Sequence, residues 1–181
     1  SMGNKITIDS ATMMNKGFEV IEAFWLFNIN LNKIDIVVHP QSLIHSMIEF
    51  IDGSIKAQIS IPDMRLPILY ALSYPERIKL NDIEYDFNIY KHMDFEPADL
   101  NKFKCIKLAY NAIKLGGTYP TVLNVSNDIA VRLFLEEKIS FIEIPEIINK
   151  AMNKHISINS PTLENILETT KWTESFLEGY N

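Results

Sequence analysis

The sequence predicts a mixed α/β protein that continues into an all-α domain resembling a four-helix bundle. Three patterns support this fold class. The first 38 residues read as strand, helix and strand, which is a βαβ unit. An Asp-Gly pair then separates two apolar segments, as in a β-hairpin. Beyond residue 101, four helical segments are separated by glycine, proline and asparagine residues.

The βαβ unit is predicted from three consecutive segments. Residues 5–8 alternate between polar and apolar side chains like a strand, and residues 34–38 are apolar enough for a second one. Between them, residues from about 14 to 27 are apolar on most sides of a helix, so we expect a buried helix. Two strands joined through a helix should be parallel, with a right-handed crossover.

The next segments predict a hairpin, a short helix and a connector. Residues 47–51 and 55–59 flank the Asp52-Gly53 turn signal. A helix begins near Pro67, which suits the first turn, and ends at residues 73–75. Residues 76–101 are acidic and without periodicity, and we expect them to be ordered but irregular.

The remaining chain is predicted to be helical. The expected helices span about 102–115, 120–137, 144–153 and 161–178. Trp172 lies near the edge of the apolar stripe of the last helix, which favours a packing role. We therefore divide the chain into an α/β domain at 1–77, a connector at 78–101 and a helical domain at 102–181.

Composition excludes several classes of function. The chain has 181 residues, of which 47% are hydrophobic, so it can bury one large core or two small ones. A net charge of −6 without a Lys/Arg block argues against nucleic acid or an anionic membrane as the main partner. No apolar run reaches the roughly 18 residues of a membrane span, and no signal pattern is visible. Cys105 is the single cysteine, and a buried thiol together with a cytoplasmic localisation is expected.

Polar side chains interrupt the apolar helix predicted at residues 14–27. Asn15, Glu19 and Glu22 fall within an arc of roughly 60°, and Lys16 lies roughly 60° beyond Glu19. A buried carboxylate without partners costs several kcal/mol, so this stripe should face a cation, hydrogen-bond donors or a water-filled cleft.

These residues suggest an anion and metal site at the start of the helix. The hydroxyl of Ser10, the amide of Asn15 and the ammonium of Lys16 are suited to a phosphate near a helix N-terminus. Glu19, one turn further, is suited to a divalent cation. In a simpler interpretation, a hydroxyl caps the helix, Lys16 pairs with Glu19 and Glu22 is solvated, and the spacing leaves both interpretations open.

Two further observations concern histidine and glycine. His45 precedes the hairpin, which is placed to act as a flap over the polar stripe, although a lone loop histidine is more often structural. With only six glycines, the chain contains neither a dinucleotide-binding fingerprint nor a P-loop. A nucleotide, if used, should be bound mostly elsewhere.

Several motifs together resemble a known enzyme family. They are DSATMMNKG at 9–17, EVIEA at 19–23, HPQS at 39–42, IHSM at 44–47 and PDMR at 62–65. These motifs resemble 1-deoxy-D-xylulose 5-phosphate reductoisomerases. CIKLA at 105–109 and PTVLN at 120–124 are similar to the helical carboxyl-terminal domain of that family. The resemblance covers essentially the whole chain but only the latter half of the enzyme, including part of its catalytic domain.

The resemblance implies an oxidoreductase that depends on NADPH and on Mg²⁺ or Mn²⁺. Such enzymes convert 1-deoxy-D-xylulose 5-phosphate to 2-C-methyl-D-erythritol 4-phosphate in non-mevalonate isoprenoid biosynthesis. The implied partners are this phosphorylated sugar and a second copy of the chain in a homodimer.

The resemblance also implies roles for single residues. These are substrate binding by Ser10, Asn15, Lys16 and Glu19, metal binding by Glu19, catalysis by Glu19 and His45, and cofactor binding by Gly3 and Met2. Glu22 matches a further polar position nearby. The family's other metal carboxylates and its nucleotide domain would precede Ser1, so we expect the chain alone to be inactive. The alternative is a non-catalytic dimerisation or scaffold module.

Overall fold

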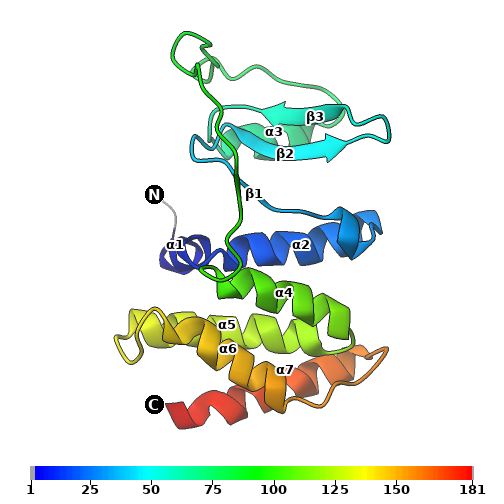
Figure 1. The fold of residues 1–181 in the computed structure, drawn as a ribbon, viewed down its shortest axis with the longest axis vertical. Coiled ribbons are helices and arrows are strands. Elements are labelled where there is room, and N and C mark those ends of the chain that lie inside the picture. The colour runs from blue at the N-terminus through cyan, green and yellow to red at the C-terminus, as the bar shows by residue number, and fades with distance from the viewer. Residues whose placement is uncertain (1–2, 181) are drawn as a thin grey trace. The chain divides into compact units, whose positions relative to one another are not determined.

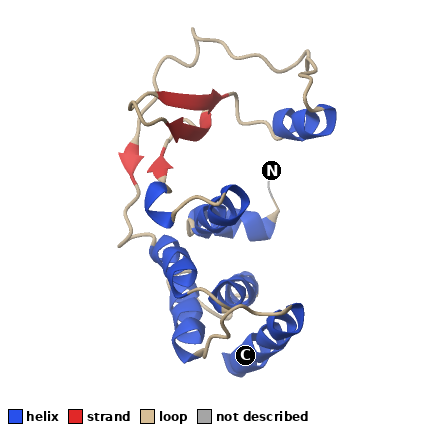
Figure 2. Ribbon diagram, turned by 90° about the vertical axis from the view of Figure 1, so that its right-hand side faces the viewer, coloured by secondary structure: helices blue, strands red, loops and turns tan. Residues whose placement is uncertain are grey.

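The computed structural model describes residues 3–180, without the side chain of Tyr180, and forms two compact units. Residues 1–36 and 99–181 form the first, which we call the helical unit, and residues 37–98 form the second, the hairpin unit. All described strands lie in the hairpin unit, as Figure 2 shows.

The helical unit contains six α-helices and two short 3₁₀-helices among its described residues. They are α1 (Asn4–Ala11), α2 (Met14–Phe27), η1 (Leu31–Lys33), α4 (Lys104–Leu115), α5 (Tyr119–Leu135), α6 (Glu143–Lys154), α7 (Leu163–Leu177) and η2 (Glu178–Tyr180). In Figure 1, α2, α4 and α5 lie in successive layers, and α5 also contacts α1, α6 and α7. The four helices predicted after residue 101 are confirmed, as is the helix predicted at residues 14–27. No described helix is long and apolar enough to cross a membrane.

The core of the helical unit lies around α5. Its largest fully buried side chains include Leu123 on α5, Ile106 on α4 and Ile148 on α6. Cys105 is 1% exposed, and burial raises the pKa of its thiol to about 12, so the thiol is not reactive at neutral pH. The predicted burial of this cysteine is confirmed.

Two loops meet at one end of the bundle. The backbone N–H of Thr118, after α4, donates to Ser157 Oγ at 3.2 Å, and the Ile158 N–H donates to Thr118 Oγ1 at 3.1 Å. His155 Nε2 lies 2.7 Å from the same Thr118 oxygen. The His155 ring also contacts Trp172, with centroids 5.1 Å apart. These contacts join the loop between α4 and α5 to the loop between α6 and α7, and they confirm the packing role predicted for Trp172.

The partial burial of His155 leads us to expect a pH dependence of stability. Burial lowers the pKa of His155 below its ordinary value of 6.5, so the unfolded chain binds a proton before the folded one does. The contribution of the neutral ring is therefore fully present above about pH 6.5 and is lost as the pH falls below that value. We expect the free energy of unfolding to fall more steeply below pH 6.5 in the wild type than in His155→Gln. Urea titrations across this range test the expectation, and parallel slopes would contradict it.

The hairpin unit contains two antiparallel strand pairs and one helix. Strand β2 (Ile44–Glu49) pairs with β3 (Ile55–Ile59), and β1 (Val37–Val38) pairs with β4 (Glu96–Pro97). The tight turn between β2 and β3 contains Gly53 at φ +81°, so the predicted hairpin is confirmed. Helix α3 (Arg65–Ser73) lies close to its predicted position.

The predicted βαβ unit is wrong. Residues 5–8 are part of helix α1, and of residues 34–38 only the last two form a strand, which is antiparallel to β4. The alternation at residues 5–8 is too short to distinguish a strand from a helix. Lys5 and Asp9 form an ion pair at the i, i+4 spacing of a helix, with 2.7 Å between Nζ and Oδ2. The Ile34 carbonyl accepts from the Tyr110 hydroxyl at 2.9 Å rather than from a strand.

The compact units are divided differently from the predicted domains. The prediction placed α1 and α2 with the hairpin in residues 1–77, whereas these helices pack with α4 and α5. The domain boundaries stay a prediction.

Candidate functional site

The candidate site begins on the first two turns of α2. Asn15 Nδ2 donates to Glu19 Oε1 at 2.9 Å, and Lys16 Nζ lies 2.9 Å from both carboxylate oxygens. The side chains of Lys16 and Glu19 are each 45% exposed. The sequence therefore places an amide, an ammonium and a carboxylate together, where added ligands can reach them.

The corner between α1 and α2 sets where this helix begins. Met13 has a left-handed backbone, with φ 61° and ψ 14°, which turns the chain between the two helices. The buried Thr12 donates from Oγ1 to the Ile8 carbonyl at 3.0 Å and accepts from the Met14 N–H at 3.3 Å. Thr12 thus links the end of α1 to the start of α2, whereas Ser10 makes no side-chain hydrogen bond among the described residues.

A buried carboxylate lies directly before Ser10. Asp9 is 2% exposed, and its two oxygens accept from Asn127 Nδ2 of α5 at 2.8 Å and from Lys5 Nζ at 2.7 Å. Lys5 also pairs with the exposed Asp128 at 3.0 Å. Partial burial alone would lower the pKa of Lys5, but the hydrogen bonds to the two carboxylates outweigh it and raise that pKa.

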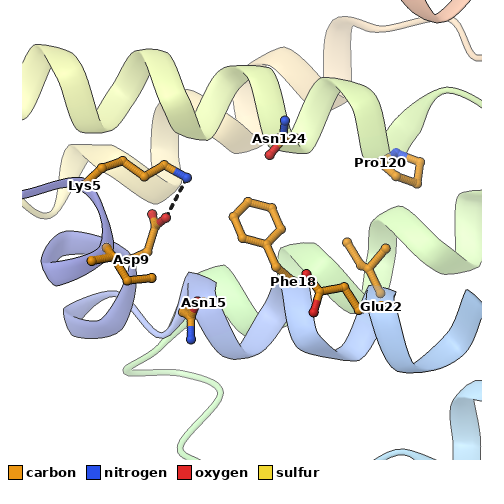
Figure 3. Close-up of a pocket in the computed structure, with 9 residues that line it drawn as sticks. Lys5, Asp9, Asn15, Phe18, Glu22, Pro120 and Asn124 are labelled. Carbon is orange, nitrogen blue, oxygen red and sulfur yellow. Dashed lines mark ion pairs between the residues drawn. The ribbon is translucent and has the colours of Figure 1, made fainter. Parts of the chain in front are cut away.

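A shallow cleft lies between α2 and α5 on the side of Asn15 (Figure 3). It is lined by Lys5, Ile6, Asp9, Asn15, Phe18, Ile21, Glu22, Pro120 and Asn124. The predicted polar stripe is thus divided between two faces: Asn15 and Glu22 line the cleft, whereas Glu19 pairs with Lys16 beside it. Neither carboxylate of the stripe is buried.

The donor set on α2 fits one part of a divalent-metal site. Glu19 offers anionic oxygens of the kind that Mg²⁺ and Mn²⁺ prefer, and its carboxylate is exposed. Within residues 3–180, no group of three or more His, Cys, Asp or Glu side chains is arranged to hold a metal ion. Glu19 can therefore supply one ligand of such a site, with further ligands from outside the described set.

The remaining predicted site residues lie outside α2. His45 is on β2 in the hairpin unit, exposed, with Nε2 3.2 Å from the Ser60 carbonyl oxygen. Gly3 caps α1 with an extended backbone and is exposed, and a Cβ placed there would meet nothing within 4 Å. Met2 lies outside the described residues. The roles assigned to these residues stay predictions.

Two residues of the buried network were missed in the sequence. Neither Asp9 nor Asn127 is assigned an individual role from the sequence. The available signal was the position of Asn127 on the apolar face of its helix, between Leu123 and Ala130, where an amide must find a hydrogen-bond partner. The identity of that partner was not visible, because Asp9 is 118 residues away.

Comparison with protein families gives two matches. A family described as "DXP reductoisomerase C-terminal domain" matches residues 59–176. A second, described as "1-deoxy-D-xylulose 5-phosphate reductoisomerase C-terminal domain", matches residues 1–27. The two matches include α2 of the candidate site and most of the helical unit.

Curated relatives carry the same description. A 1-deoxy-D-xylulose 5-phosphate reductoisomerase of Thermoanaerobacter pseudethanolicus is 57% identical over 171 residues, which are 94% of this chain and 45% of that protein. The protein of the same name from Chloroherpeton thalassium is 52% identical over 176 residues, 97% of this chain and 46% of its own length. The chain thus spans a little under half the length of these relatives.

Solved structures agree with these matches. A 1-deoxy-D-xylulose 5-phosphate reductoisomerase from Zymomonas mobilis in complex with NADPH superposes with a TM-score of 0.90 at 46% identity, covering 96% of this chain and 47% of that one. A DOX-P reductoisomerase in complex with NADPH, fosmidomycin and magnesium gives a TM-score of 0.91 at 42% identity, covering 99% of this chain and 46% of that one.

Proposed function

Because this chain belongs to the 1-deoxy-D-xylulose 5-phosphate reductoisomerase family, we propose that it supplies part of the substrate and metal site of such an enzyme. The proposed reaction converts 1-deoxy-D-xylulose 5-phosphate to 2-C-methyl-D-erythritol 4-phosphate, with NADPH and Mg²⁺ or Mn²⁺. The observation that carries this proposal is the convergence of Asn15, Lys16 and Glu19 on the first two turns of α2.

The substrate is proposed to bind where donors gather at the α1–α2 corner. The Lys16 ammonium and the Asn15 amide are cationic and neutral donors for phosphate or hydroxyl oxygens. The Ser10 hydroxyl, which is half-buried and not committed to another described side chain, is a third donor. A phosphorylated sugar needs several donors with one nearby positive charge, and this corner offers that set.

Glu19 is proposed to bind the metal together with ligands from outside this chain. Its carboxylate is already held by Asn15 and Lys16, which keeps it oriented before a ligand binds. When bound, Mg²⁺ or Mn²⁺ stabilises negative charge on the substrate oxygens, and NADPH supplies a hydride. Gly3 and Met2 are proposed to lie beside the nicotinamide. At Gly3, the absence of a side chain and of close neighbours leaves room for a planar ring.

His45 is proposed to donate a hydrogen bond to bound substrate from the hairpin. The ring is exposed on β2, and its described partner is one backbone carbonyl. A ring N–H of histidine can donate to a phosphate or hydroxyl oxygen.

The proposal is tested by comparing the chain with a longer form. We define the full-length form as this chain joined to the amino-terminal half that its relatives carry. With Mn²⁺ and 1-deoxy-D-xylulose 5-phosphate, we expect the full-length form to oxidise NADPH and the 181-residue chain alone to be inactive, because Glu19 cannot complete a metal site by itself. Absorbance at the NADPH band measures both. An inactive but folded full-length form would refute the proposal.

A second candidate, a dimerisation or scaffold module, is favoured by exposed apolar side chains on the hairpin. They are Met47, Ile48, Phe50, Ile51, Ile55 and Ile59. Exposed apolar patches of this kind often mark protein interfaces. Size-exclusion chromatography of the chain with a Mn²⁺ titration separates the candidates: a stable homodimer without metal affinity fits the module alone.

A cytoplasmic localisation also stays a prediction.

A further inference from the structure

The buried Asp9 carboxylate connects the candidate site to the helical bundle. Asp9 immediately precedes Ser10, and it is bound from α5 by the fully buried Asn127 at 2.8 Å and from its own helix by Lys5 at 2.7 Å. Figure 3 shows Lys5 and Asp9 paired at one end of the cleft. A buried carboxylate requires such partners, so the contact restrains where α1 ends.

A second contact restrains α2. A Cβ placed on Gly17 would lie 2.7 Å from the Ala109 Cβ, so the backbones of α2 and α4 approach as closely as this glycine allows. The segment from Ser10 to Glu19 is therefore fixed at two points, by Asn127 of α5 near one end and by Ala109 of α4 near the other. Both helices come from the carboxyl-terminal part of the chain.

The Asn127 amide is not optimally satisfied by this arrangement. Its Oδ1 atom is buried and has no hydrogen-bond partner among the described residues. The amide group of Asn127 is therefore used on one side only, by the hydrogen bond that it donates to Asp9. An apolar side chain there would leave the buried Asp9 oxygen without this donor, so the amide both satisfies and orients the carboxylate.

We propose that the Asp9–Asn127 hydrogen bond is a positioning contact. Through it, the carboxyl-terminal helices hold the corner that bears Ser10 in line with the face of α2 that carries Asn15, Lys16 and Glu19. Neither residue touches the reacting atoms in this proposal. The inference rests on the proposed function, and it predicts that disturbing the pair changes catalysis in molecules that remain folded.

The experiment is a double-mutant cycle in the full-length form. The variants are Asp9→Asn, Asn127→Asp and the exchanged pair that carries both changes. Asn127→Asp places two carboxylates side by side, and we expect it to lower kcat/KM at least about 10-fold, as is typical when the partner that orients a ligand is lost. Asp9→Asn keeps the shape and one amide contact, and we expect a smaller loss. The exchanged pair restores one carboxylate and one amide, and we expect kcat/KM within about 3-fold of the wild type.

The controls separate positioning from stability. Asn149→Asp makes the same chemical change at an exposed position of α6 and should leave kcat/KM unchanged. Melting temperatures are measured for every variant, and kinetics are measured well below all of them, so that each variant is folded. The apparent Mn²⁺ affinity is recorded together with kcat and KM. A fall in kcat or in Mn²⁺ affinity that the exchanged pair reverses supports the proposal.

Three outcomes would overturn the proposal. One is an unchanged kcat/KM in folded Asn127→Asp, and another is a loss that the exchanged pair does not reverse. The third is a loss of activity that disappears on cooling, since it would reflect unfolding alone. If the wild-type full-length form is itself inactive, the proposed function fails and this inference fails with it. Each of the other outcomes requires an active wild type, so the two failures are distinguishable.

Discussion

Replacing Glu19 by glutamine in the full-length form should lower kcat at least about 100-fold, because a direct metal ligand should matter more than the outer partners, whose loss costs about 10–100-fold. The amide keeps the shape of the side chain but removes its charge. The Lys16–Glu19 ion pair is lost as well, but both side chains are 45% exposed, and such pairs contribute about 0–1 kcal/mol. Stability should therefore change by less than about 1 kcal/mol. Steady-state kinetics and urea denaturation measure the two effects.

The matched control for this variant is Glu146→Gln. Glu146 lies on α6, is 62% exposed and faces Lys104 at 4.0 Å, so the change removes an equivalent surface pair away from the candidate site. We expect its kcat to equal that of the wild type. A Glu19→Gln variant with near-normal turnover would remove Glu19 from the metal site, whereas equal losses in both variants would point to a general electrostatic effect.

Replacing Gly117 by alanine should destabilise the helical unit by about 2–4 kcal/mol, the combined effect of a strained backbone and overpacking. Gly117 has φ +54°, which side chains with a Cβ rarely adopt. A Cβ there would also overlap Ser157 Oγ and approach the Ile158 carbonyl oxygen to 2.5 Å. The new methyl group would separate the two loops that Thr118 holds together. Urea denaturation followed by circular dichroism measures the loss.

The neighbouring glycine provides the control. Gly116 has φ +67°, but the nearest atom to a Cβ placed there is the Ile113 carbonyl oxygen at 4.0 Å. Gly116→Ala should therefore cost about 1–3 kcal/mol from the backbone alone, because φ +67° with ψ −159° is a conformation essentially restricted to glycine. Both variants reduce the entropy of the unfolded chain equally, so a larger loss in Gly117→Ala would come from the steric clash. A loss below about 1 kcal/mol in Gly117→Ala would contradict the expected clash.

The elements that were predicted correctly have strong local signals. Helix α2 follows from a long apolar segment, and the β2–β3 hairpin follows from the Asp52-Gly53 turn. The four later helices follow from their periodicity and from helix-terminating residues such as Gly116-Gly117. In each case the deciding residues lie within the element or next to it. A single sequence is sufficient where neighbouring residues determine the backbone.

The grouping of three polar side chains on α2 was predicted for the same reason. Asn15, Lys16 and Glu19 are close in sequence, so helical geometry alone brings them together, as the structure shows. The cleft was not predictable in the same way. It requires Pro120 and Asn124 of α5, which lie more than 100 residues from Asn15 and approach α2 only through packing.

The sequence by itself determined most helices, the hairpin, the local grouping on α2 and the resemblance to the family. Only the tertiary structure decided that residues 5–8 are helical and that Asp9 is buried. A pattern of four alternating residues is compatible with a strand and with a helix almost equally, so local preference did not decide between them. The helix is consistent with the pairing of Asp9 with Lys5 and with Asn127, the latter 118 residues away. The free energy of that pairing depends on folding of the whole unit, and no window of the sequence contains it.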